Sequence, residues 1–166
     1  ATHSCCRALC RHPRNMTDEM ICALAAAGGV IQINFYPLFL DDGFAEVLAS
    51  SGIQERGESI ESEFIADPSD PARRAAWNAV QDELMALSRP SFRLIADHID
   101  HVVSLVGTDH VGLGSDFDGI DVTPEGMEDA SCFHKIFDEL RTRGYSEEDL
   151  AKIAGGNLFR VMDDQA

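Results

Sequence analysis

The sequence predicts an α/β domain built on a parallel sheet. Segments 30–36 and 110–115 are rich in β-branched, aromatic or small apolar residues, as strands are. Residues 1–4 resemble the end of a further strand, and helical periodicity lies between and after these segments. Strands that alternate with helices are typical of a parallel sheet, whose chemistry lies at the carboxyl ends of its strands. We expect residues 1–166 to form a single domain.

The first helix is predicted from its capping signals. Thr17 is a suitable N-cap, and Asp18 and Glu19 place negative charge in the first turn, where the helix dipole favours it. Gly28 and the glycine that follows it end this helix. The strand over 30–36 comes next, and Pro37 is expected to end it.

The segment from 38 to about 70 is acidic and is expected to be irregular, with short helical turns at about 44–50 and 58–65. Pro71, preceded by an aspartate, predicts the start of a long helix that continues to about Leu87.

Further helices follow in the second half of the chain. A helix is expected at about 92–106, ahead of the strand at 110–115, and another at about 130–143. Ser146 is a suitable cap for the next helix, which has three acidic residues in its first turn. A last helical turn is expected at 158–162.

The charge balance limits the partners. Lys and Arg number 13 and Asp and Glu 29, which gives a net charge of −16. Such an acidic surface argues against nucleic acid or an anionic membrane as partner. No apolar run approaches the ~20 residues that span a bilayer.

The cysteines are odd in number, and four of the five lie in the first 22 residues. This pattern favours free thiols in a reducing compartment over a disulfide scaffold. A metal knuckle at Cys5, Cys6 and Cys10 is the alternative, although no C-x-x-C pair is present. The thiols and the polar tail at 163–166 together predict a cytoplasmic protein.

The strongest candidate for chemistry is Asp116. The apolar strand runs into an acidic turn that ends at Gly119, and this presents a carboxylate at the strand end. Asp116 could be a metal ligand or a general base, or it could only cap the loop. Asp118, followed by glycine, fits a turn role.

Histidine and arginine side chains near the N-terminus are further candidates. His3 could bind a metal through a ring nitrogen or could be a capping or core residue. Arg14 could bind a substrate carboxylate with two parallel hydrogen bonds, although the residues alone favour a solvated loop arginine. His98 and His101 are three apart on one predicted helix. We expect them to be structural because zinc-binding helices use a spacing of four.

Taken in order, several segments resemble the C-terminal half of the membrane dipeptidase (renal dipeptidase) family, peptidase family M19. They extend over nearly the whole chain and are THS at 2–4, RN at 14–15, NFY at 34–36, DHIDH at 97–101, GLGSDFDG at 112–119, GMED at 126–129, RGYS at 143–146 and GNLFRV at 156–161.

The resemblance implies the C-terminal portion of a (β/α)8 TIM barrel and a hydrolase that uses two zinc ions to cleave dipeptides. By position, His3 resembles a zinc ligand and Arg14 the residue that binds the substrate carboxylate. Asp116 resembles the acid/base carboxylate that passes a proton to the leaving amine. The same comparison assigns His98 and His101 to a structural helix.

The family's other zinc ligands lie upstream of the segment that corresponds to His3. A barrel needs ~250 residues, so the resemblance predicts an incomplete part of the enzyme that is inactive alone. Association with the missing N-terminal half or a homo-oligomer would cover its open sheet edges. The alternatives are another amidohydrolase-like barrel metal hydrolase and a non-catalytic dipeptidase-like binding module.

Overall fold

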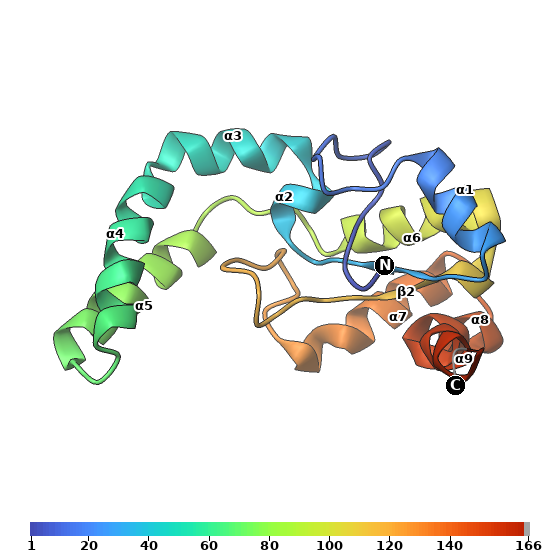
Figure 1. Cartoon of the computed structure of the whole chain (residues 1–166). Helices are drawn as coiled ribbons and strands as arrows, with labels where there is room; N and C mark the ends of the chain where they lie inside the picture. Colours follow the sequence, from blue (N-terminus) through green and yellow to red (C-terminus); the bar gives the residue numbers. More distant parts are fainter. Residues whose placement is uncertain (165–166) are drawn as a thin grey trace.

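The computed structural model describes residues 1–164, and the end of the polar tail, 165–166, lies outside the described residues. The described chain forms a small parallel sheet packed among helices, and a helical arm, residues 42–85, extends from it to one side (Figure 1). No helix within residues 1–164 has both the length and the apolar character needed to cross a bilayer.

The predicted parallel sheet is confirmed, with shorter strands than expected. Strand β1 (Ile31–Ile33) pairs in parallel with β2 (Val111–Leu113). On the other side of β1, Ser4 forms a parallel bridge to Ile33, and the Asn34 N–H donates to the Ser4 carbonyl at 3.1 Å. Each regular strand therefore lies within its predicted segment, 30–36 or 110–115, and residues 1–4, which were expected to end a strand, form a bridge to β1 at Ser4.

Helices from both halves of the chain pack around this sheet. Helix α1 contacts α6, and α6 contacts α7 and both strands. Ile33, Phe35 and Ile99 are fully buried in the resulting core. The helices are α1 (Asp18–Ala26), α6 (Arg93–Val106), α7 (Phe133–Thr142), α8 (Glu147–Ala151) and α9 (Asn157–Asp164), with 3₁₀ turns η1 (Thr108–His110) and η2 (Ala130–Cys132) and a segment η3 (Lys152–Gly156) that joins α8 to α9 and is kinked at Gly155.

The predicted helix caps are confirmed. The Thr17 side chain accepts a hydrogen bond from the Met20 N–H and caps α1. Ser146 and Asp149 form a reciprocal capping box at the start of α8. These caps satisfy N–H groups that the first turn of a helix leaves without partners.

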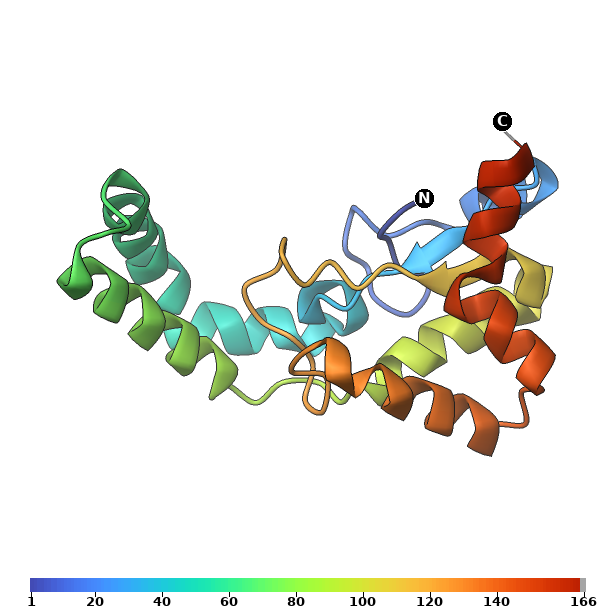
Figure 2. The ribbon, with the colours of Figure 1, turned by 90° about the horizontal axis from the view of Figure 1, so that it is seen from below.

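The helical turns expected at about 44–50 and 58–65 are confirmed, but the prediction that segment 38–70 is otherwise irregular was wrong, because the segment is almost entirely helical. It comprises α2 (Pro37–Leu40), α3 (Asp42–Ser51) and α4 (Ile53–Ala66), and α5 (Pro71–Met85) follows. Helices α4 and α5 pack against each other, and Figure 2 shows them reaching away from the sheet. Only Ile53 of α4 is buried, so the helix carries little apolar periodicity for sequence analysis to detect.

The chain end was also predicted too short. Helix α9 extends over Asn157–Asp164, and its first side chain is buried. The Asn157 amide donates to the carbonyls of Thr108 at 2.7 Å and Val111 at 2.8 Å. The Val111 carbonyl belongs to a strand with no further partner among the described residues, so a side chain closes this edge of the sheet.

Candidate functional site

The carboxyl ends of the strand segments bring polar side chains together. Asn34 follows β1, Asp116 follows β2, and His3 lies in the segment that flanks β1. The Asn34 Nδ2 donates to Asp116 Oδ2 at 3.0 Å. A side chain at Gly114 would meet the Thr2 carbonyl, so a glycine is required for these two segments to approach each other.

Asp116 has an unusual backbone conformation. Its φ of 70° is the only positive φ at a non-glycine residue in the described chain. Its carbonyl accepts from the Gly119 N–H at 2.9 Å, and a side chain at Gly119 would collide with the Asp116 carboxylate. Such left-handed strain persists only where the surroundings impose it, and it is concentrated at functional sites.

Asn34 is a residue that sequence reasoning did not single out. It is fully buried, and its Oδ1 accepts from the Tyr36 N–H at 2.6 Å while its amide holds Asp116. The signal available in the sequence is a polar residue between two buried apolar ones, Ile33 and Phe35, at a strand end. A buried amide with both ends bonded fixes the orientation of the carboxylate.

His3 and Arg14 are brought into direct contact. The Arg14 guanidinium donates to His3 Nε2 at 3.1 Å, and His3 Nδ1 lies 2.8 Å from Thr2 Oγ1. Because arginine has no acceptor, Nε2 carries the lone pair and Nδ1 the proton. The exposed Arg14 lies over the Phe39 ring, 5.5 Å from its centroid.

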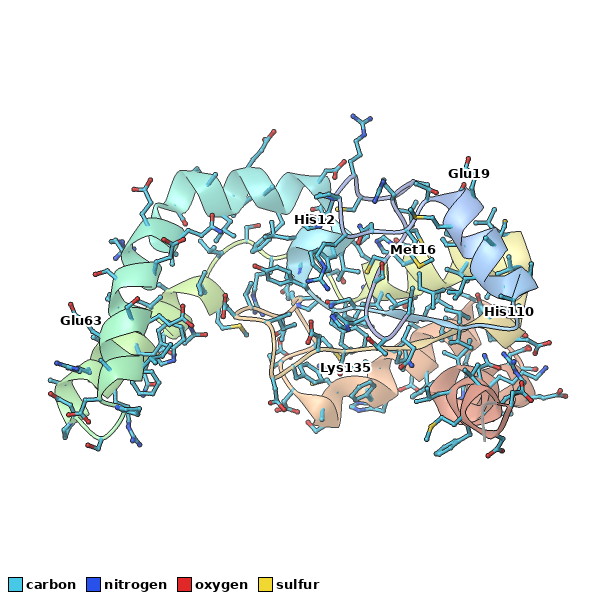
Figure 3. The ribbon with its side chains drawn as sticks, viewed as in Figure 1. His12, Met16, Glu19, Glu63, His110 and Lys135 are labelled. Atoms are coloured by element: carbon cyan, nitrogen blue, oxygen red, sulfur yellow. The ribbon has the colours of Figure 1, made fainter. Side chains whose placement is uncertain are left out.

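The loop that presents Arg14 is held against α2. The His12 ring packs on Phe39 with centroids 4.4 Å apart, and its Nδ1 accepts from the Arg14 N–H at 3.2 Å. Figure 3 shows His12 beside α2. Ser4 Oγ also donates to the Arg14 carbonyl at 2.9 Å. These contacts place Arg14 beside the strand ends.

His98 and His101 have the structural roles that were expected. His98 is buried, its Nδ1 accepts from the Cys6 N–H at 3.0 Å, and its Nε2 lies 3.3 Å from the Leu40 carbonyl. Burial lowers the pKa of His98 to about 4, so the ring is neutral at neutral pH. His101 Nε2 lies 2.8 Å from Asp18 Oδ1.

The cysteines form no metal knuckle. All five are unpaired, and the thiols of Cys5, Cys6 and Cys10 donate to the backbone carbonyls of Asn34, His98 and Leu38. Burial raises the pKa of all three thiols, and the described residues bring no group of three or more His, Cys, Asp or Glu side chains together around them.

The donors for a zinc ion are of the right kind but too few. His3 offers an imidazole nitrogen and Asp116 a carboxylate, both ordinary zinc ligands. Within residues 1–164, no group of three or more His, Cys, Asp or Glu side chains is placed to hold an ion. A zinc site has about four ligands, three of them from protein when it is catalytic. This part of the chain therefore fits part of a zinc site.

Comparison with known proteins identifies the family. The family model for membrane dipeptidase (peptidase family M19) matches residues 1–166. The chain belongs to this family. Dipeptidase aclJ of Aspergillus oryzae is 32% identical over 163 residues, which are 98% of this chain and 29% of that protein.

Solved structures agree with this membership. The probable dipeptidase PvdM from Pseudomonas aeruginosa matches 96% of this dipeptidase-family chain and 43% of its own, with a TM-score of 0.68 and 30% identity. A metallo peptidase from Rhodobacter sphaeroides, solved with a phosphinate mimic of the dipeptide L-Ala-D-Ala, matches 98% of this chain and 35% of its own. Its TM-score is 0.67 and its identity 24%, which shows the shared fold. The chain spans less than half the length of these three proteins.

Proposed function

We propose that this chain forms the C-terminal part of a zinc-dependent dipeptidase on a (β/α)8 barrel. His3 is a zinc ligand, Arg14 binds the substrate carboxylate, and Asp116 is the acid/base. The observation that carries the proposal is Asp116 itself. Its carboxylate accepts a hydrogen bond from the buried Asn34 amide, and its own backbone is in the strained left-handed conformation. It lies at the strand ends, where His3 and Arg14 meet. The names of the relatives, dipeptidase and metallo peptidase, support this choice.

The residues of the chain divide the work on the substrate. The Arg14 guanidinium presents parallel N–H donors that match the C-terminal carboxylate of a dipeptide, and this favours short substrates. Asn34 occupies Asp116 Oδ2 and leaves Oδ1 to carry a proton to the departing amine. Zinc, when bound, polarises the scissile carbonyl and activates water. The lone pair of His3 Nε2, which accepts from Arg14 in this structure, is the one that would bind the metal.

We further propose that the chain needs ligands from additional protein to become active. His3 and Asp116 supply two donors, and the described residues bring no third to them. The rest would come from an N-terminal half or from association of copies. We place the protein in the cytoplasm on the strength of its unpaired thiols.

The test compares the chain alone with a longer protein that also contains the upstream half of a dipeptidase. Zinc content and turnover of glycine-containing dipeptides are measured on both. We expect tight zinc binding and turnover only in the longer protein. Full activity of the chain alone would refute the proposal that it is incomplete, and a zinc-loaded but inactive longer protein would favour a binding module.

A further inference from the structure

A cavity of about 250 Å³ lies where the helical arm meets the loop after β2. Helices α3, α4 and α5 form most of its wall, and Tyr36, Asp121 and Val122 complete it. In Figure 2 the loop after β2 lies between the arm and the body of the molecule. The cavity is therefore on the side of the sheet where the strands end.

Part of the cavity lining is apolar and aromatic. Ile53, Trp77 and Val80 line it, and the Trp77 ring is stacked on Phe64 with centroids 6.0 Å apart and planes 7° from parallel. This stacking orders the indole. An indole face attracts a cation, and the aliphatic side chains suit an apolar stem.

The lining also contains acidic residues. Glu58 and Glu61 of α4 and Asp121 of the loop line the cavity, and no Lys or Arg is among its lining residues. No ion pair within residues 1–164 involves these three carboxylates, whereas Arg56 of the same helix is paired with Glu83 at 2.6 Å. Carboxylates gathered around a hollow raise the local concentration of cations.

The cavity is connected to the candidate catalytic residues through Tyr36. Its side chain lines the cavity, and its N–H donates to Asn34, which in turn holds Asp116. Asp121 comes five residues after Asp116 in the same loop. Burial and the charge of Asp121 raise the pKa of Tyr36, which keeps its phenol neutral.

We propose that this cavity binds the cationic end of a basic side chain, a primary ammonium or guanidinium group on an apolar stem. The acidic wall pairs with the charge, and Trp77 and Ile53 cover the stem. On the proposed dipeptidase function, this makes dipeptides with a lysine or arginine residue the preferred substrates.

The binding part of the proposal can be tested without catalysis. Trp77 is the only tryptophan in the chain, so its fluorescence reports on the cavity directly. The chain is titrated with n-pentylammonium, with n-pentanol and pentanoate as probes of the same length. We expect a saturable change with the ammonium alone. No saturable change, or an equal response to pentanol, would overturn the proposal.

Matched variants separate a built site from general attraction to an acidic protein. Glu58→Gln combined with Glu61→Gln removes two cavity charges, and we expect affinity for pentylammonium to fall about tenfold. Glu55→Gln combined with Glu63→Gln removes two charges from the same helix outside the cavity lining and should leave affinity unchanged. All four side chains are exposed, so the fold should persist. Equal weakening in both pairs would overturn the proposal.

The substrate part is tested in the longer protein by comparing kcat/KM for lysyl-alanine and norleucyl-alanine. We expect a preference of about tenfold for the lysyl dipeptide, and the Glu58→Gln, Glu61→Gln pair should abolish it. Equal kcat/KM values would overturn the substrate inference while the dipeptidase function stood. Binding of pentylammonium, detected by fluorescence, without turnover of any dipeptide would instead count against the dipeptidase function alone.

Discussion

Acidification should destabilise the chain through His98. This buried imidazole is neutral in the folded state, and its pKa is about 4 against an ordinary value of 6.5. Between these two values the unfolded chain binds a proton that the folded chain does not, so the free energy of unfolding falls as the pH falls. One pKa unit corresponds to ~1.4 kcal/mol, so the loss from this one residue is about 3 kcal/mol.

The measurement is urea unfolding followed by Trp77 fluorescence and circular dichroism, from pH 7 to pH 4. Carboxylates also lose their partners in acid, so the relevant quantity is the difference between the parent chain and His98→Asn. Asparagine retains an acceptor but does not titrate. We expect the stability advantage of the parent over this variant to shrink by about 3 kcal/mol across the range.

His134→Asn is the control. Because His134 is exposed on α7, the free energy of unfolding of this variant should depend on pH as that of the parent does. If the advantage of the parent over His98→Asn stays constant from pH 7 to pH 4, His98 does not remain neutral in the folded core, and the reasoning from its burial fails.

Three other predictions follow from named contacts. Asn157→Leu removes the side-chain donor to two backbone carbonyls and should lower the free energy of unfolding, measured in urea, by about 2–4 kcal/mol. The control, Asn78→Ala on the exposed face of α5, should change the free energy of unfolding by under ~0.5 kcal/mol. In the longer protein, Asp116→Asn should lower kcat at least ~100-fold in a dipeptide hydrolysis assay, and Asp118→Asn, in the exposed turn, should retain most activity. Arg14→Lys should raise KM for dipeptides about tenfold with less effect on kcat, since lysine cannot form the bidentate pair, and an unchanged KM would contradict that role.

Local chemistry made several elements predictable from sequence. Thr17 and Ser146 cap helices because their hydroxyls reach N–H groups two or three residues on, a contact that needs no tertiary structure. The two strands were also predictable, because both are buried and their segments are accordingly rich in apolar residues. Asp116 was identified because a strand end followed by a glycine-bounded turn is itself a local pattern.

The arm and the partner of Asp116 depend on tertiary contacts. Helix α4 has one buried residue, so its stability comes from packing against α5, the next helix along the chain, rather than from an apolar pattern of its own. Asn34 acts through a hydrogen bond across 82 positions, and neither its spacing nor its neighbours indicate Asp116 as its partner. Arg14 was singled out as a carboxylate-binding residue only through the family resemblance, since a solvated loop arginine has the same sequence signature, and its contact with His3 was not predicted.

The left-handed backbone at Asp116 has a consequence for selection on stability. A non-glycine residue in this conformation costs up to ~1–2 kcal/mol, and the greater flexibility of unfolded glycine offsets ~0.5–1 kcal/mol of what Asp116→Gly would recover. The same substitution removes the acceptor of the buried Asn34 amide, and a buried donor without a partner costs ~1–3 kcal/mol. That variant should therefore be no more stable than the parent, and a screen for thermostability alone should retain the aspartate at position 116.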